Sequence, residues 1–120
     1  MRAIAFNEFG GPEVLQITEF PDPVPKSGEV VVRVVATTVN PTDVMMRSGL
    51  QAALMTHLKP PYIGGMEFAG HVHSVGDGSS ALPIGQAVMG VVNARRPQGG
   101  GHAQLVCVPA VSLARLVHPA

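Results

Sequence analysis

The sequence predicts a mainly β domain, a partly open barrel of about seven short strands with one short helical insert. Valine-rich runs of strand length alternate with turn residues, and the 14 glycines and 11 prolines are spread along the chain instead of forming a low-complexity block. Only residues 40–49 begin and end with clear helix signals. The 120 residues are enough for one modest core, so we expect a single domain over residues 1–120.

The first part of the chain is predicted to form three strands. Residues 2–7 end at a glycine-rich turn, and residues 14–20 alternate well enough for a half-exposed strand. The prolines of residues 21–25 supply no ladder donors, so this stretch is an extended connector. Residues 30–39 form a nearly continuous apolar run, which predicts a strand buried on both faces, with Arg33 in need of a partner or an exit to solvent.

A short helix is predicted between Asn40 and Gly49. Pro41 suits the first helical position, because its missing N–H would have no partner there. Asn40 is a good N-cap, and the Asp43 carboxylate can compensate the positive end of the helix and pair with Arg47 one turn later. A strand that ends at a capped helix leaves polar side chains at the rim of the packed scaffold, so we expect the functional site here.

The second half of the chain returns to strands. Residues 51–58 have helical propensity, but proline and glycine pairs follow and predict an irregular, mobile excursion. Residues 66–75 form a strand in which Phe68 and Val72 share one face, while Glu67, His71 and His73 share the other. Three further strands are predicted at residues 86–92, 103–108 and 112–117.

Composition excludes several classes of protein. Eight basic and eight acidic side chains cancel, which argues against a nucleic-acid partner or an anionic membrane surface. We find no apolar run long enough to span a bilayer and no signal peptide at the start of the sequence. The single cysteine, Cys107, lies in an apolar strand, where it is expected to be a small buried hydrophobe. A lone cysteine fits a reducing compartment, so we expect a cytoplasmic protein.

Several stretches in this order resemble one family. They are Arg2-Ala3, FGGPEVL (residues 9–15), PDPVPKSGEVVVRV (21–34), VNPTDVMMRSG (39–49) and PPYIGGMEFAGHVHSVG (60–76). Together they resemble the N-terminal, GroES-like catalytic domain of medium-chain dehydrogenases/reductases. Within that superfamily they are most similar to the zinc-free quinone oxidoreductase (zeta-crystallin-like) branch. The resemblance covers essentially the whole chain.

The resemblance implies an NADPH-dependent reductase of quinones or activated enones, with this domain supplying one wall of the active-site cleft. The Rossmann domain would follow residue 120 and is missing, and no strand–GxGxxG–helix unit occurs. NADP(H) is therefore expected as cofactor only together with that missing cofactor-binding domain. The 120-residue chain alone is expected to be inactive and not to bind NADPH tightly.

The resemblance also implies that there is no catalytic metal. Zinc-dependent relatives carry a zinc-binding cysteine where Asn40 stands and a zinc-binding histidine where Met66 stands. An amide and a thioether are poor zinc ligands beside thiolate and imidazole. Without a Lewis acid, the acceptor carbonyl must be polarised by hydrogen bonds and held in position.

The same resemblance assigns roles to side chains around the helix start. Asn40 is the candidate hydrogen-bond donor to the substrate and a contact for the cofactor, with a plain N-cap as an equally good interpretation. Thr42 occupies the place of a proton-relaying hydroxyl, although an exposed threonine of the first helical turn would look the same. Met45 and Met66 would line the substrate site as a soft apolar wall, with Met45 in place of a tyrosine, unless such methionines belong to the core. Residues expected to support the site are Asp43, Arg47 and Glu67.

Two other hypotheses about function remain open. The chain can be a stand-alone GroES-like binding module that uses residues 50–63 as a mobile loop for a protein partner, or it can be an inactive remnant. The pair His71 and His73 lacks an evident fourth ligand, so a solvated strand face explains it better than a metal site. Because residues 44–58 are apolar and weakly charged, we expect them to be exposed without a partner domain and to promote self-association.

Overall fold

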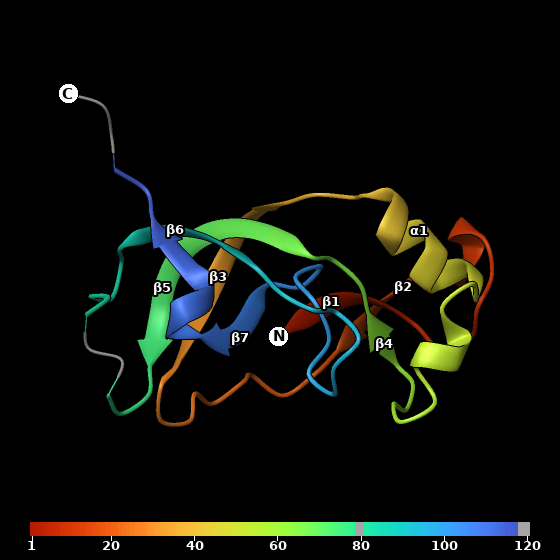
Figure 1. The fold of residues 1–120 in the computed structure, drawn as a ribbon, viewed down its shortest axis with the longest axis horizontal. Helices are drawn as coiled ribbons and strands as arrows, with labels where there is room; N and C mark the ends of the chain where they lie inside the picture. Colours follow the sequence, from red (N-terminus) through yellow and green to blue (C-terminus); the bar gives the residue numbers. More distant parts are fainter. Residues whose placement is uncertain (79–80, 118–120) are drawn as a thin grey trace.

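The structure, a computed structural model, describes residues 1–78 and 81–117 and confirms the mainly β prediction (Figure 1). Within these residues, eight strands form a three-stranded sheet of order β2-β1-β4 and a five-stranded sheet of order β7-β3-β5-β6-β8, which do not close into a complete barrel. The strands are β1 (Arg2–Phe6), β2 (Gln16–Glu19), β3 (Glu29–Thr37), β4 (Tyr62–Ile63), β5 (Glu67–Val75), β6 (Ala87–Val91), β7 (Leu105–Pro109) and β8 (Leu113–Arg115). The helix α1 spans Pro41–Ser48, and 3-10 turns span Pro12–Val14, Ala52–Leu54 and Ala110–Ser112.

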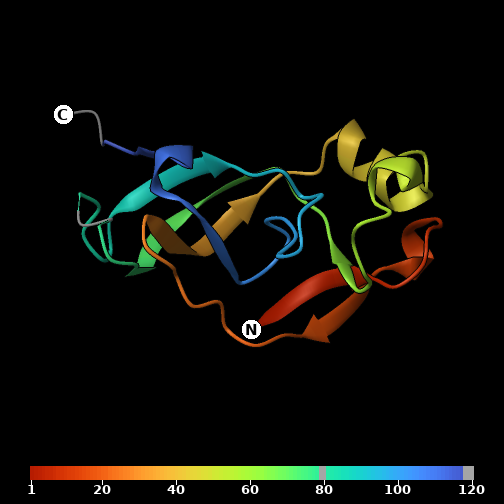
Figure 2. The same ribbon diagram turned by 60° about the horizontal axis from the view of Figure 1, so that its bottom comes forward.

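The molecule is elongated, with extents of 43 × 31 × 23 Å. Figures 1 and 2 show the five-stranded sheet at one end and α1 at the other, joined by the long segments that leave β3 and enter β5. The segment after β3 runs directly into α1, so the end of β3 sets the position of the helix. The predicted site therefore lies between the two ends of the molecule.

The main core lies on one face of the five-stranded sheet. Phe68 and Val72 of β5 point into it, while Glu67, His71 and His73 are exposed on the opposite face, as the period of two predicts. The other buried members of this core are Val30, Val32, Val88, Val92, Val106 and Val108. Valines on neighbouring strands thus form the core in a domain that has no tryptophan.

The prediction that residues 30–39 are buried on both faces is wrong for the second half of this stretch. Val30–Val32 are fully buried, but Val35 and Val39 are 68% and 72% exposed. The reason is that β7, the strand on one side of β3, pairs with it only from Glu29 to Arg33. Beyond that point β3 has β5 as its only paired strand among the described residues.

Two strands of the small sheet differ from the prediction. The strand expected at residues 14–20 begins at Gln16, because Val14 ends a 3-10 turn and packs into the core beneath α1. Sequence analysis missed β4, whose two residues pair with Ala5 and Phe6. A strand of two residues after a pair of prolines is too short to show an alternating apolar and polar pattern in the sequence.

The methionines following the predicted site belong partly to a second core. Met46 and Met55 are each 2% exposed and pack with Phe6, Val14 and Ala94. The expectation that residues 44–58 form one exposed apolar segment is therefore wrong, although Leu50 and Leu54 remain 78% and 58% exposed. Only Ala52–Leu54 of the helix-prone residues 51–58 form a helical turn.

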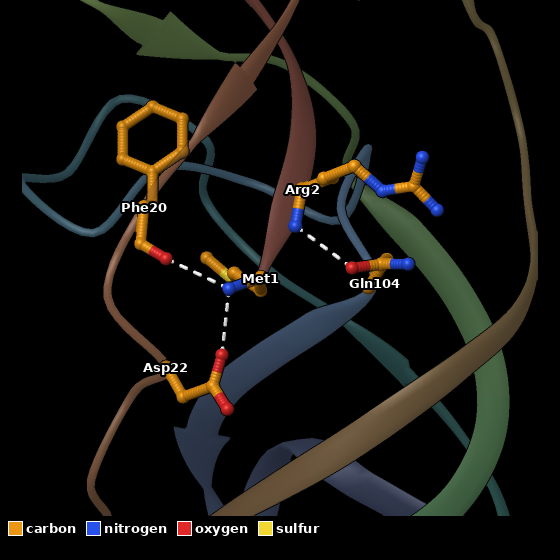
Figure 3. A network of polar contacts seen from close by, with 5 residues as sticks. All are labelled: Met1, Arg2, Phe20, Asp22 and Gln104. Atoms are coloured by element: carbon orange, nitrogen blue, oxygen red, sulfur yellow. Dashed lines mark hydrogen bonds and ion pairs between the residues drawn. The ribbon is translucent and has the colours of Figure 1, made fainter.

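The N-terminus is fixed to the end of the neighbouring strand (Figure 3). The Met1 ammonium donates to the Phe20 carbonyl at 2.7 Å and to Asp22 Oδ1 at 2.6 Å. The hydrogen bond from the ammonium, followed by its positive charge, lowers the pKa of Asp22 from its ordinary value of 3.8. In the part of the chain that the structure describes, no helix is both long enough and apolar enough to cross a bilayer.

Candidate active site

Helix α1 starts where the sequence predicts. Asn40 is the N-cap in extended conformation, Pro41 is the first helical residue, and Gly49 ends the helix in the left-handed region with a φ of 96°. Each of these signals is local, since it depends on the backbone geometry of one or two residues. The helix therefore follows from sequence almost residue by residue.

Asp43 ties the helix start to a distant segment. Its Oδ2 accepts a hydrogen bond from the Asn40 backbone N–H at 2.8 Å, and its Oδ1 accepts one from the Gly65 N–H at 2.9 Å. The side chain is 8% exposed, so these bonds replace water for a buried carboxylate. The expected Asp43–Arg47 pair is wrong, because Arg47 Nε donates instead to the Gly10 carbonyl at 3.3 Å.

Gly65 is packed against His102. Gly65 has a φ of 99°, and a Cβ there would lie 2.6 Å from the imidazole ring and 2.7 Å from the backbone nitrogen of His102. His102 Nε2 lies 2.8 Å from the Thr38 carbonyl oxygen, which can only accept, so this nitrogen carries the hydrogen. Through this hydrogen bond, His102 fixes the segment that connects β3 to α1. The sequence analysis missed this residue, which stands after three glycines with no motif around it.

Three polar side chains form a network at the N-terminus of α1. Thr38 Oγ1 donates to Glu67 Oε2 at 2.8 Å, and Asn40 Nδ2 donates to Thr38 Oγ1 at 3.0 Å and to Glu67 Oε2 at 3.2 Å. The bonds from Thr38 and then from Asn40 lower the pKa of Glu67 from its ordinary value of 4.5. The structure thus joins Asn40 to Glu67 and adds Thr38, which sequence analysis missed. Both amide hydrogens of Asn40 are donated within the protein.

Thr42 and Met66 lie together at a small cavity, whereas Met45 does not. Both side chains line a cavity of about 30 Å³, together with Gln51 and Asn93. Gln51 Oε1 is buried there and has no hydrogen-bond partner among the described residues. Met45 is 38% exposed on the outer side of α1 and does not line this cavity. Its predicted contact with substrate therefore needs a ligand larger than the cavity.

Other candidate residues lie outside this group. The described residues contain no cluster of three or more histidine, cysteine, aspartate or glutamate side chains that could hold a metal ion. The His73 Nδ1 atom lies 3.2 Å from an Arg33 guanidinium nitrogen on the exposed face of the large sheet. Cys107 is buried as predicted, and burial, followed by the nearby Glu29 carboxylate, raises the pKa of its thiol to about 11. A thiol with that pKa is a poor nucleophile at neutral pH.

Comparison with known proteins gives a consistent picture. Residues 26–118 match the family model described as the alcohol dehydrogenase GroES-like domain. The quinone oxidoreductases of Rattus norvegicus and Homo sapiens are 44% and 41% identical to this chain over 91 residues, which is 73% of this chain and 26% of each relative.

Solved structures agree with these sequence matches. The Escherichia coli quinone oxidoreductase complexed with NADPH superposes with a TM-score of 0.84 at 32% identity, covering 98% of this chain and 33% of that one. The quinone oxidoreductase from Coxiella burnetii gives a TM-score of 0.85 at 30% identity, covering 96% of this chain and 36% of that one. This chain spans only about a quarter of the length of the curated relatives.

Proposed function

Because this chain belongs to the alcohol dehydrogenase GroES-like domain family, we propose that it is the substrate-side domain of a zinc-independent, NADPH-dependent oxidoreductase. The acceptor in this proposal is a quinone or an enone, that is, a carbonyl conjugated to an alkene. The observation that supports it most is the polar network at the start of α1, in which Asn40 donates to Thr38 and Glu67. The resemblance implies zinc ligands at the positions of Asn40 and Met66 in zinc-dependent relatives, and neither side chain here is a good zinc ligand. The similarity of this chain to proteins named quinone oxidoreductases also supports a quinone as the acceptor.

The proposed reaction adds one hydride and one proton to the acceptor. A bound NADPH would supply the hydride. As the hydride arrives, negative charge develops on the acceptor oxygen, and a preorganised donor stabilises that charge. Asn40 Nδ2 is this donor: the acceptor oxygen takes the place of Glu67 Oε2, which holds the longer of its two hydrogen bonds at 3.2 Å. Thr38 keeps the amide in position meanwhile through the 3.0 Å bond.

Thr42 is the proposed route for the proton. It lies two residues after Asn40 in the first turn of α1, half-buried, at the cavity shared with Met66. Its hydroxyl can donate a proton to the reduced oxygen and take one from solvent. Met45 and Met66 would contact the apolar ring of the acceptor, and polarizable thioethers adapt to rings of different shape. Asp43, Arg47 and Glu67 hold the backbone and side chains of this site through the bonds described above.

The glycine-rich stretch of the described chain is not arranged to bind the phosphates of a dinucleotide. Its three consecutive glycines, residues 99–101, do not open a helix. The N–H groups of Gly100 and Gly101 donate instead to the carbonyls of Ile63 and Gly65, at 2.8 and 2.9 Å. Only the nicotinamide end of the cofactor would meet Asn40. A cofactor-binding domain is therefore the partner that the proposed activity requires.

A chimera tests the proposal. Residues 1–117 would replace the matching part of the Escherichia coli quinone oxidoreductase, whose remaining polypeptide supplies the cofactor-binding domain. We expect the chimera to oxidise NADPH with 1,4-naphthoquinone, to contain no stoichiometric zinc by elemental analysis, and to keep its rate after dialysis against a chelator. Turnover that depends on added zinc, or a folded chimera that binds NADPH but reduces no quinone, would contradict the proposal.

A further inference from the structure

A small cavity lies beside the first turn of α1, next to the proposed proton route. Its volume is about 30 Å³, and Thr42, Gln51 and Asn93 are among the residues that line it. One water molecule needs a cavity of roughly 10–15 Å³ and two to four polar partners. The cavity is therefore too small for the ring of an acceptor but large enough for a water molecule.

Gln51 brings an unpaired hydrogen-bond acceptor to this cavity. Its Oε1 atom is buried and accepts no hydrogen bond from a described residue. The side chain does not cap the 3-10 turn that follows it either. Burying an amide oxygen without a partner is unfavourable, and ordered water commonly supplies the missing donor in folded proteins. Gln51 Oε1 therefore requires a donor that no described side chain or backbone group supplies.

The backbone around Gln51 is fixed by its own hydrogen bonds. Gly49 ends α1 in the left-handed region, and its carbonyl accepts a hydrogen bond from the Ala52 N–H at 3.0 Å. The Gln51 carbonyl accepts one from the Leu54 N–H at 2.9 Å. This ordered turn brings Gln51 back to the cavity that the first turn of α1 also lines.

The other polar side chains around the cavity can complete the coordination of a water. The Thr42 hydroxyl can both donate and accept. Asn93 Oδ1 accepts a hydrogen bond from the Arg95 N–H at 3.0 Å, so the Asn93 amide hydrogens are the part of that side chain left to donate. Asp43 also lines the cavity, but both of its carboxylate oxygens already accept backbone hydrogen bonds. A water here would donate to Gln51 and Thr42 and accept from Asn93.

We propose that this cavity binds one water molecule and that Gln51 is a positioning residue, which holds this water as the proton source for Thr42. The inference rests on the proposed function for the reaction that it serves. As the Thr42 O–H bond breaks and its proton passes to the reduced oxygen of the acceptor, Thr42 Oγ1 takes a proton from the water. Solvent returns a proton to that water beside Asn93, which is exposed. The Gln51 amide neither gains nor loses a proton.

Nuclear Overhauser effects from water to this chain test the site without requiring catalysis. Met46 lines the cavity and is 2% exposed, so its methyl group is shielded from bulk water. With isotope-labelled methionine methyl groups, we expect an effect from a long-lived water to the Met46 methyl that Gln51→Leu abolishes. Gln98→Leu replaces an exposed glutamine that does not line the cavity and should leave the effect unchanged. No effect in the unmodified chain, or the same effect in Gln51→Leu, would overturn the proposal.

Kinetics of the chimera test the positioning role. We expect Gln51→Leu to lower kcat with 1,4-naphthoquinone about tenfold, less than the roughly 10²–10⁴-fold contribution of a complete proton donor, because Thr42 remains. KM should not change, since Gln51 would not contact the acceptor. The solvent deuterium isotope effect on kcat should rise, because proton delivery would then limit the rate.

Two further variants separate positioning from folding. Gln51→Glu keeps an oxygen acceptor at the same place and should retain most of the rate, and Gln98→Leu should match the unmodified chimera. Equal losses of kcat in Gln51→Leu and Gln51→Glu, or a change in KM alone, would contradict the proposed role of Gln51.

These outcomes also separate the inference from the proposed function. If the chimera reduces quinone and its Gln51→Leu variant is equally fast, the water route is wrong and the proposed activity stands. If the chain holds the long-lived water but the chimera reduces no quinone, the water site stands, and the proposed activity is wrong together with the role of this water as a proton source.

Discussion

At the level of single residues, the proposed activity depends on how the Asn40 side chain is held. Both amide hydrogens are donated, one to Thr38 and one to the Glu67 carboxylate. In the proposed reaction, the bond to Glu67 would be exchanged for a bond to the substrate oxygen. Because that oxygen becomes negatively charged in the transition state, one charged acceptor would replace another, and the free-energy cost of the exchange would be small. A ground-state carbonyl competes less well with the carboxylate. In the proposed reaction, the arrangement would therefore favour the transition state over the bound substrate.

The Glu67 carboxyl group gives a direct test of this network. Its pKa is lowered by the Thr38 bond first and by the Asn40 bond second. Because the folded-state pKa is depressed, the stabilisation is present above the ordinary value of 4.5 and is lost as the pH falls through the lower folded-state value. We expect Thr38→Val to move the Glu67 pKa back toward 4.5 in a side-chain carboxyl NMR titration.

The control for this titration is Thr18→Val, since among the described residues the Thr18 hydroxyl bonds only to the Gln16 carbonyl on β2. This variant should leave the Glu67 pKa where it is in the unmodified protein. A Glu67 midpoint that does not change in Thr38→Val would show that the threonine hydroxyl does not hold the carboxylate.

The sequence predicted the cap position of Asn40, but it did not predict the roles of Thr38 and His102. Asn40 stands between a strand and a proline, and its cap position follows from local geometry. Thr38 and His102 have no such signal, because their roles come from contacts with Glu67 and Thr38 that are 29 and 64 residues away in sequence. Long-range partners of this kind become visible only once the strands are paired.

At the level of elements, α1 joins the site to the second core. One turn of the helix carries Met45 on the outside and Met46 on the inside, with exposed fractions of 38% and 2%. Met46 packs with Phe6 and Val14 of the small-sheet segment. The helix is therefore fixed by Met46, next to the residue proposed to contact substrate, as well as by Asp43 at its start.

This adjacency predicts unequal effects on stability. Met46→Ala removes a buried side chain and should lower the free energy of unfolding by about 2–5 kcal/mol. Met45→Ala, its neighbour on the exposed side, should change that free energy by no more than about 0.5 kcal/mol. Urea unfolding of both variants measures the difference. Similar losses in the two variants would mean that the helix is not packed as described.

The strands show where sequence patterns fail at this scale. The alternation within β5 predicts both of its faces, because one sheet face is core and the other is solvent. The apolar run of β3 predicts burial that only its first half has, since β7 ends opposite Arg33. An apolar sequence shows which side chains a strand is able to bury. The length of the neighbouring strand decides how many of them are shielded from solvent.

At the level of the whole molecule, the domain has a valine core in the large sheet and a smaller core beneath α1. The proposed site lies between these two regions, where β3 ends and α1 begins.

The most direct test of the central claim is the rate of quinone reduction in the chimera with Asn40 replaced. Asn40→Ala removes the proposed donor to the acceptor oxygen, and Asn7→Ala removes an exposed asparagine just after β1 as a control. We predict that Asn40→Ala lowers kcat/KM with 1,4-naphthoquinone by about 10²-fold, the effect of one lost oxyanion donor, while Asn7→Ala leaves it unchanged. An unchanged kcat/KM in a folded Asn40→Ala chimera would contradict the claim and leave Asn40 as a helix cap alone.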